Sequence, residues 1–186
     1  MDALEKTDIY TSDEFLAMTD LKGRFELIGG EIYDMSPSPN IFHQRLSREL
    51  LVRINSYITD HHGKCEVIAA PSDVKLDDYN TVQPDIYVVC DPDKLDEQKC
   101  NGAPDWVIEI MSPSNGKRDA ADKVFLYSKA GVREYWVIDP EEKKVMVHHF
   151  GKTNIVGLYT FDDTITAGIY KDAAEPLDIC IEALLK

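Results

Sequence analysis

Apolar residues repeat along this chain with two different periods. Between residues 40 and 63 they recur about every 3.6 positions, from Phe42 to Ile58, and a glycine follows as a helix stop. This spacing predicts the longest helix of the chain. Residues 117–131 predict a second helix that also closes at a glycine, and residues 10–20 predict a short first helix with a Thr-Ser cap.

Shorter runs rich in β-branched and aromatic residues predict strands. Residues 24–39 contain two such runs around a Gly-Gly pair, which can adopt the positive φ angles of a two-residue hairpin turn. Residues 134–161 predict three strands in a meander. Further strands are expected at residues 65–70, 73–76, 85–90 and 105–111.

The order of these elements predicts an α/β (α+β) fold with a mixed β-sheet core flanked by helices. No repeat, low-complexity tract or linker divides the chain, so we expect one domain over residues 1–186. Residues 90–104 form the longest irregular connection. A loop of this length in a compact domain is expected to be mobile.

Composition narrows the class of protein. With 44% hydrophobic residues, a chain of 186 residues can build a substantial core. No apolar run approaches the roughly 20 residues that span a bilayer, and the N-terminus lacks a secretory signal, so a soluble cytoplasmic protein without membrane contact is expected. No CxxC pair occurs among the cysteines at positions 65, 90, 100 and 180. Reduced thiols are therefore expected.

The charge excludes one class of function. Thirty-four acidic residues against 20 basic ones give a formal net charge of −14, which repels polyanions at long range. A protein that coats nucleic acid is therefore excluded, and any nucleic-acid role depends on a local site. The candidates for a local basic surface are Arg45, Arg48, Arg53, Lys117 and Arg118.

Two acidic residues interrupt otherwise apolar strands. Asp85 lies in QPDIYVVC and Glu109 lies in DWVIEIM, and a buried carboxylate is costly unless it is paired, hydrogen-bonded or metal-bound. On adjacent strands the two carboxylates would repel each other, and a divalent cation such as Mg²⁺ or Mn²⁺ would relieve that repulsion. Alternatively, Asp85 caps a turn and Glu109 forms a structural salt bridge.

A downstream lysine could complete such a site. In GKRDAADKVFLY, Asp119, Lys123 and Tyr127 follow one another at i, i+4 positions along one helical face. An ammonium group aimed at the carboxylates can orient a water and offset charge that develops on a phosphate. The alternative is an exposed lysine that pairs with Asp119.

The order of these motifs resembles a known family. Pro84-Asp85 on one strand and Glu109 on another resemble the PD-(D/E)XK nuclease signature. The longer run FELIGGEIYDMSPSP, His43, QPDI, VIEIMSPSN, D...K...Y and AGVREYWVIDP resembles the Uma-two family of restriction-endonuclease-like proteins. The likeness is unbroken through YWVIDP, and the remaining tail matches only loosely.

The resemblance implies a restriction-endonuclease-like fold in which Asp85 and Glu109 ligate the metal, with Glu31 as a supporting acid. The superfamily pattern places a lysine two residues after the glutamate, where this chain has Met111. The resemblance therefore assigns the catalytic lysine to Lys123 on the following helix.

Substrate contacts are expected nearby. His43 matches a family position and could contact a phosphate or a metal-bound water, although a capping or packing histidine is an equal alternative. Ser112 and Ser114 in MSPSN could hydrogen-bond a phosphate, or they could be an ordinary strand exit.

The leading hypothesis is a Mg²⁺-dependent endonuclease that hydrolyses DNA phosphodiester bonds and acts as a homodimer. One alternative is a catalytically degenerate binding or scaffold protein of the same fold, which Met111 and the acidic surface motivate. Another is a hydrolase of small phosphoesters, which uses the same metal chemistry and suits an acidic protein better.

Overall fold

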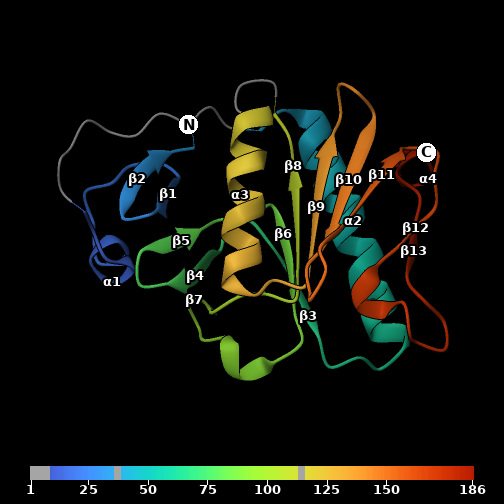
Figure 1. Cartoon of the computed structure of the whole chain (residues 1–186), viewed down its shortest axis with the longest axis horizontal. Coiled ribbons are helices and arrows are strands. Elements are labelled where there is room, and N and C mark those ends of the chain that lie inside the picture. The colour runs from blue at the N-terminus through green and yellow to red at the C-terminus, as the bar shows by residue number, and fades with distance from the viewer. Residues whose placement is uncertain (1–8, 36–38, 113–115) are drawn as a thin grey trace.

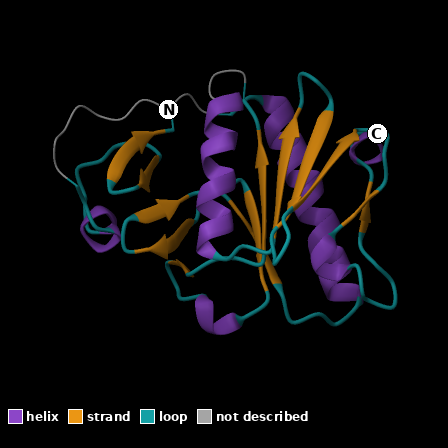
Figure 2. Cartoon of the chain, in the orientation of Figure 1, coloured by secondary structure: helices purple, strands orange, loops and turns teal. Residues whose placement is uncertain are grey.

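The computed structural model of the chain describes residues 9–35, 39–112 and 116–186, except for the side chains of residues 116–121. Figure 1 shows two main β-sheets with a long helix on either side of the larger one, and a third sheet has only two strands. Figure 2 separates the short strands on the left of the view from the longer strands on the right. The predicted α/β class with helices flanking mixed sheets is confirmed, but the strands are divided between two main sheets.

The smaller of the two main sheets has five strands in the order β2-β1-β5-β4-β7. The predicted Gly-Gly turn joins its first hairpin, since both glycines have positive φ, 61° and 84°. The short helix α1 (Ser12–Leu16) precedes this hairpin. The strands are β1 (Phe25–Ile28), β2 (Glu31–Asp34), β4 (Asp73–Asp77), β5 (Asn80–Val82) and β7 (Lys99–Asn101).

The larger sheet has six strands in the order β11-β10-β9-β8-β6-β3. Its β8 and β9 pair in parallel, and the helix α3 (Gly116–Ala130) forms the crossover between them. The helix α2 (Ile41–Asp60) lies on the opposite face. The strands are β3 (Glu66–Ala69), β6 (Ile86–Val89), β8 (Trp106–Ile110), β9 (Glu134–Asp139), β10 (Lys144–His149) and β11 (Ile155–Thr160).

The C-terminal segment packs beside α2 and ends in a short helix. It contributes to the same apolar core through buried residues such as Leu177 and Ile181. The remaining elements are two strands, a helix and two 3₁₀ helices: β12 (Ile165–Thr166), β13 (Asp178–Ile179), α4 (Ile181–Leu184), η1 (Pro92–Lys94) and η2 (Gly168–Tyr170).

Alternation of side chains gives the larger sheet two buried faces. On β8, Trp106, Ile108 and Ile110 pack toward α2, whereas Val107 packs toward α3 and the smaller sheet. Glu109 shares the second face with Val107. Both faces are covered, so any carboxylate on β8 or β6 needs a partner within the protein.

Two expectations about the middle of the chain are wrong. Residues 90–104 are not an irregular loop, because they contain η1 and β7, and β7 pairs in parallel with β4. The four cysteines are not all reduced, because Cys65 and Cys90 form a disulfide. The cause is the antiparallel pairing of β3 with β6, which brings the two flanking cysteines opposite each other. No helix in the described residues is long and apolar enough to cross a bilayer.

Candidate active site

The segment between β5 and β6 crosses from the smaller sheet to the larger one, and it places Asp85 beside β8. One carboxylate oxygen, Oδ2, accepts a hydrogen bond from the backbone N–H of Ile110 at 2.8 Å. The same oxygen lies 3.0 Å from His43 Nε2 near the start of α2. An ionised carboxylate only accepts, so Nε2 carries the hydrogen in this pair. Asp85 is buried, and these donors compensate its desolvation.

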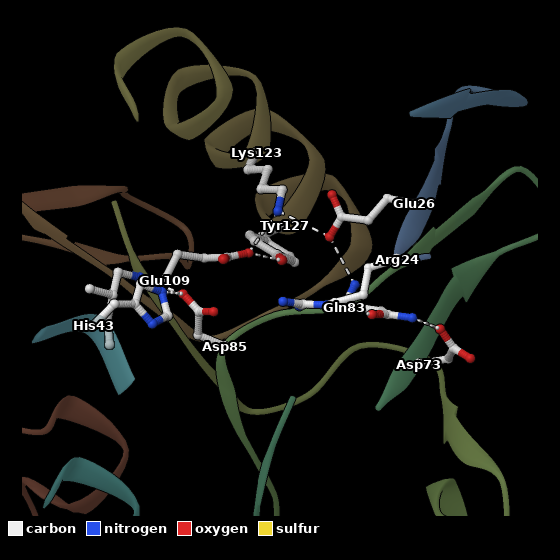
Figure 3. A network of polar contacts seen from close by, with 10 residues as sticks. Arg24, Glu26, His43, Asp73, Gln83, Asp85, Glu109, Lys123 and Tyr127 are labelled. Atoms are coloured by element: carbon white, nitrogen blue, oxygen red, sulfur yellow. Dashed lines mark hydrogen bonds and ion pairs between the residues drawn. The ribbon is translucent and has the colours of Figure 1, made fainter. Parts of the chain in front are cut away.

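Glu109 points from β8 toward α3, where two side chains hold one of its oxygens. Lys123 Nζ and the Tyr127 hydroxyl each donate to Glu109 Oε1, both at 2.9 Å. The i, i+4 spacing along α3 brings both donors to the same carboxylate (Figure 3). Lys123 is buried, so the lysine is not an exposed surface residue, and the side chain of Asp119 on the same predicted face lies outside the described set.

A third carboxylate, Glu26 on β1, reaches the same lysine from the smaller sheet. Lys123 Nζ donates to Glu26 Oε1 at 3.1 Å, and the backbone N–H of Gln83 donates to the same oxygen at 2.8 Å. Glu26 is fully buried. The Gln83 side chain then donates to Asp73 and accepts from Arg24, so the network continues into the smaller sheet (Figure 3).

The charges of this cluster do not balance. Glu109 and Glu26 contact the one lysine, and Asp85 lies near enough to Glu109 for their charges to interact, so the excess is negative. Burial raises the pKa of Glu109 to about 7, Lys123 opposes this shift, and the charges of Asp85 and Glu26 add to it. Burial also holds the pKa of Tyr127 well above its usual value, so its hydroxyl remains a donor.

The donor set of the cluster fits a small hard cation. Asp85 Oδ2 and Glu109 Oε1 are taken by protein donors, whereas Asp85 Oδ1 and Glu109 Oε2 accept no hydrogen bond from the described residues. Among the described residues, no group of three or more His, Cys, Asp or Glu side chains is placed to bind a metal ion together. Mg²⁺ is commonly held by one or two carboxylates together with waters and substrate phosphates, so a two-carboxylate site suits it.

The predicted site residues separate into two groups. Asp85, Glu109, Lys123 and His43 come together as described. Glu31 does not join their hydrogen-bond network: it is exposed at the hairpin, and its Oε2 accepts from Tyr33 at 2.9 Å. The acid of this hairpin that contacts Lys123 is Glu26.

The two predicted serines follow β8. Ser112 is partly buried and has an interaction within the protein, and Ser114 lies outside the described residues. Met111, which stands at the usual lysine position, is partly buried and borders a pocket of about 180 Å³ beside the cluster. The other lining residues are Asn40, Phe42, His43, Pro140 and Glu141.

Two members of the cluster were not predicted from the sequence, and a third was predicted without a role. Glu26 had a usable signal, because it interrupts the apolar run FELI in the same way that Asp85 and Glu109 interrupt theirs. Gln83 acts through its backbone N–H, which no side-chain pattern reveals. Tyr127 was placed on the correct helix face but given no contact with Glu109.

The proposed basic surface is only partly described. Arg48 pairs with Glu49, and Arg53 donates to the carbonyl of Asp178 near the C-terminus. The side chains of Lys117 and Arg118 lie outside the described set. A basic cluster therefore remains a prediction.

The fold and the cluster define a restriction-endonuclease-like α/β protein. The family model Uma2, described as "Putative restriction endonuclease", matches residues 12–167. The chain belongs to this family.

Two further comparisons found similar proteins. The structure is similar to the crystal structure of a "putative nuclease belonging to DUF820" from Anabaena variabilis, with a TM-score of 0.76 and 24% identity over 94% of this chain and 96% of that one. At this identity the likeness shows the fold. The chain is also 27% identical over 132 residues to the uncharacterized protein slr1290 of Synechocystis sp., a match that covers 68% of this chain and 66% of that protein. It thus spans slightly less than two thirds of the relative.

Proposed function

We propose that this protein is a Mg²⁺-dependent endonuclease that hydrolyses DNA phosphodiester bonds at the cluster around Glu109. The observation that supports this most strongly is the contact of Lys123 with Glu109, 2.9 Å away, on the strand next to Asp85. Two carboxylates and a lysine are the residue types of a PD-(D/E)XK-type site, and their proximity supports the proposal, although the lysine comes from α3. Family membership supports the same class of reaction.

Each residue of the proposed site has a separate task. Asp85 Oδ1 and Glu109 Oε2 would hold the cation, which when bound supplies positive charge to stabilise the phosphate as its charge increases. Lys123 orients the attacking water and adds a second positive charge. Tyr127 and His43 fix the carboxylates by hydrogen bonds, and Glu26 holds Lys123 in place.

The test is nicking of supercoiled plasmid by wild-type protein and by Asp85→Asn and Glu109→Gln, with Mg²⁺ and with EDTA. We expect nicking that requires Mg²⁺ and that falls by at least about a hundredfold in either variant, as for loss of a main electrostatic group. Glu66→Gln, an exposed acid on the same sheet, is the matched control. Unchanged nicking in both site variants would exclude this site.

The supporting acid is tested in the same assay. Glu26→Gln is expected to reduce nicking, because Lys123 loses a buried partner. Glu31→Gln tests the assignment of Glu31 from the family resemblance against the assignment of Glu26 from the structure, because Glu31 contacts Tyr33 instead. A loss with Glu31→Gln alone would favour the family-based assignment.

The acidic composition supports a second candidate, hydrolysis of small phosphoesters, because a net charge of −14 disfavours long duplex DNA. This candidate would be selected if the protein cleaves a nucleotide phosphoester but leaves plasmid intact, and if Asp85→Asn loses that cleavage. The degenerate scaffold is the remaining alternative. Calorimetric titration with Mn²⁺ distinguishes the scaffold from an enzyme. An enzyme should bind Mn²⁺ at a site that Asp85→Asn abolishes, whereas a scaffold should bind no Mn²⁺ at that site.

A further inference from the structure

The strand β11 forms one edge of the larger sheet, and it is unusually apolar for an exposed edge. Its sequence, IVGLYT, contains no charged residue. Ile155, Val156 and Leu158 are 60%, 57% and 64% exposed. Met146 on β10 lies opposite Leu158 and is 40% exposed, so the apolar surface continues inward from the edge.

The hydrogen-bond alternation shows which backbone groups of β11 face outward. Phe161 N donates to Lys143 O, one step beyond the pairing of Thr160 with Lys144. Hydrogen-bonded and non-hydrogen-bonded pairs alternate in an antiparallel ladder. The N–H and C=O groups of residues 155, 157 and 159 therefore point toward β10, and those of Val156 and Leu158 point away from the sheet.

Natural sheets usually protect such edges with charges, prolines or bulges, because an unprotected edge can pair with another chain. Residues 155–159 of β11 have none of these, and only at the end of the strand does a charged side chain, Asp163, accept from the outward N–H of Thr160. Opposite charges stand at its two ends: Lys152 precedes the strand, and Asp162 follows it, both exposed. If the partner is another β11 strand, an antiparallel arrangement would place Lys152 of one strand near Asp162 of the other. A parallel arrangement would place like charges together.

We propose that β11 pairs antiparallel with β11 of a second copy of this chain, about a two-fold axis at Gly157. In this register Val156 and the partner's Leu158 exchange both backbone hydrogen bonds, and the reverse pair does the same. Lys152 lies opposite the partner's Asp162. This register follows from the outward-facing backbone N–H and C=O groups of Val156 and Leu158. The pairing joins the six-stranded sheets of the two copies into one continuous sheet.

The glycine at the axis fits this arrangement. Residue 157 faces its own copy as a non-hydrogen-bonded pair, the kind in which opposed side chains come closest. A Cβ at Gly157 would lie 2.6 Å from the Tyr159 ring, which already occupies that space. On the other face, Val156 and Leu158 meet the same two side chains of the second copy, which removes the exposed apolar surface from water.

A second copy suits this edge better than an open chain of copies. The opposite edge of the sheet, β3, begins with the exposed Glu66. Pairing β11 with the β3 strand of another copy would be head-to-tail and would leave free edges at both ends, whereas the two-fold pairing closes. The inference does not depend on the proposed nuclease activity.

The first test is sedimentation equilibrium of the full chain at physiological ionic strength. We expect a dimer for the wild-type protein and, for Leu158→Lys, a dissociation constant raised by about a hundredfold or more, because two apolar side chains leave the interface. Val52→Lys, which adds the same charge at an exposed position on α2, is the control and should stay dimeric. A wild-type monomer, or a Leu158→Lys dimer as tight as that of Val52→Lys, would overturn the proposal.

Charge reversal tests the direction of pairing. Lys152→Glu alone and Asp162→Lys alone should each weaken the dimer, and the double variant should restore it, because the two residues lie at opposite ends of β11 and meet only across the axis. Circular dichroism checks that every variant is folded. Failure of the double variant to recover would reject the antiparallel register.

Discussion

The two faces of β8 differ in what they contribute to the protein. Toward α2, Trp106, Ile108 and Ile110 pack in a wholly apolar layer. Toward α3, the face also carries the charged residue Glu109, which accepts hydrogen bonds from Lys123 and Tyr127. The apolar face gains free energy from burial, whereas buried ion pairs often cost as much desolvation as they return. The polar face is therefore explained better by chemistry than by stability.

The largest expected effect comes from removing the cation of the polar face. Lys123→Met leaves Glu26 and Glu109 without their shared partner, and we expect a loss of about 3–5 kcal/mol in the free energy of unfolding. Urea denaturation in a chelating buffer measures it. Adding Glu26→Gln should recover part of the loss, since one unpaired charge is removed. A loss below about 1 kcal/mol in the single variant would show that the pair is not buried as described.

The next effect comes from the apolar face. Ile108→Ala removes a fully buried side chain from the layer against α2, and a loss of about 2–4 kcal/mol in the free energy of unfolding is expected. Val52→Ala, at an exposed position on α2, should change it by less than about 0.5 kcal/mol. Calorimetry with Mn²⁺ should give the same affinity for folded Ile108→Ala as for wild type. A changed affinity would mean that the two faces are coupled.

The last expected effect is a pH dependence carried by Glu109. Its pKa is raised from 4.5 to about 7, so the folded state binds this proton more tightly than the unfolded state. The contribution of Glu109 to the stability of metal-free protein is therefore complete below pH 4.5 and is lost as the pH rises through 7. Urea midpoints at pH 5 and pH 7.5 in chelator, compared with Glu109→Gln, measure it. An equal change with pH in the variant would contradict the assignment.

Several parts of the protein could be predicted from the sequence because they depend on local patterns. The 3.6-residue spacing predicted α2, the stretch closed by Gly131 predicted α3, and the Gly29-Gly30 pair predicted the β1–β2 turn. A lone acid in each of two apolar runs gave Asp85 and Glu109, because a buried charge stands out against its neighbours. The i, i+4 relation on α3 gave Lys123 and Tyr127 on one face.

Other features were decided only by the tertiary structure. Glu26, rather than Glu31, reaches Lys123, because the smaller sheet lies against the face of β8 that carries Glu109. β7 is a strand because it pairs with β4, which is distant in the sequence. Cys65 is joined to Cys90 because β3 pairs with β6. Contacts between distant segments leave no period in the sequence. The sequence alone therefore determined the helices, most strands and the acids that need a partner, while the sheet packing decided which partner each one has.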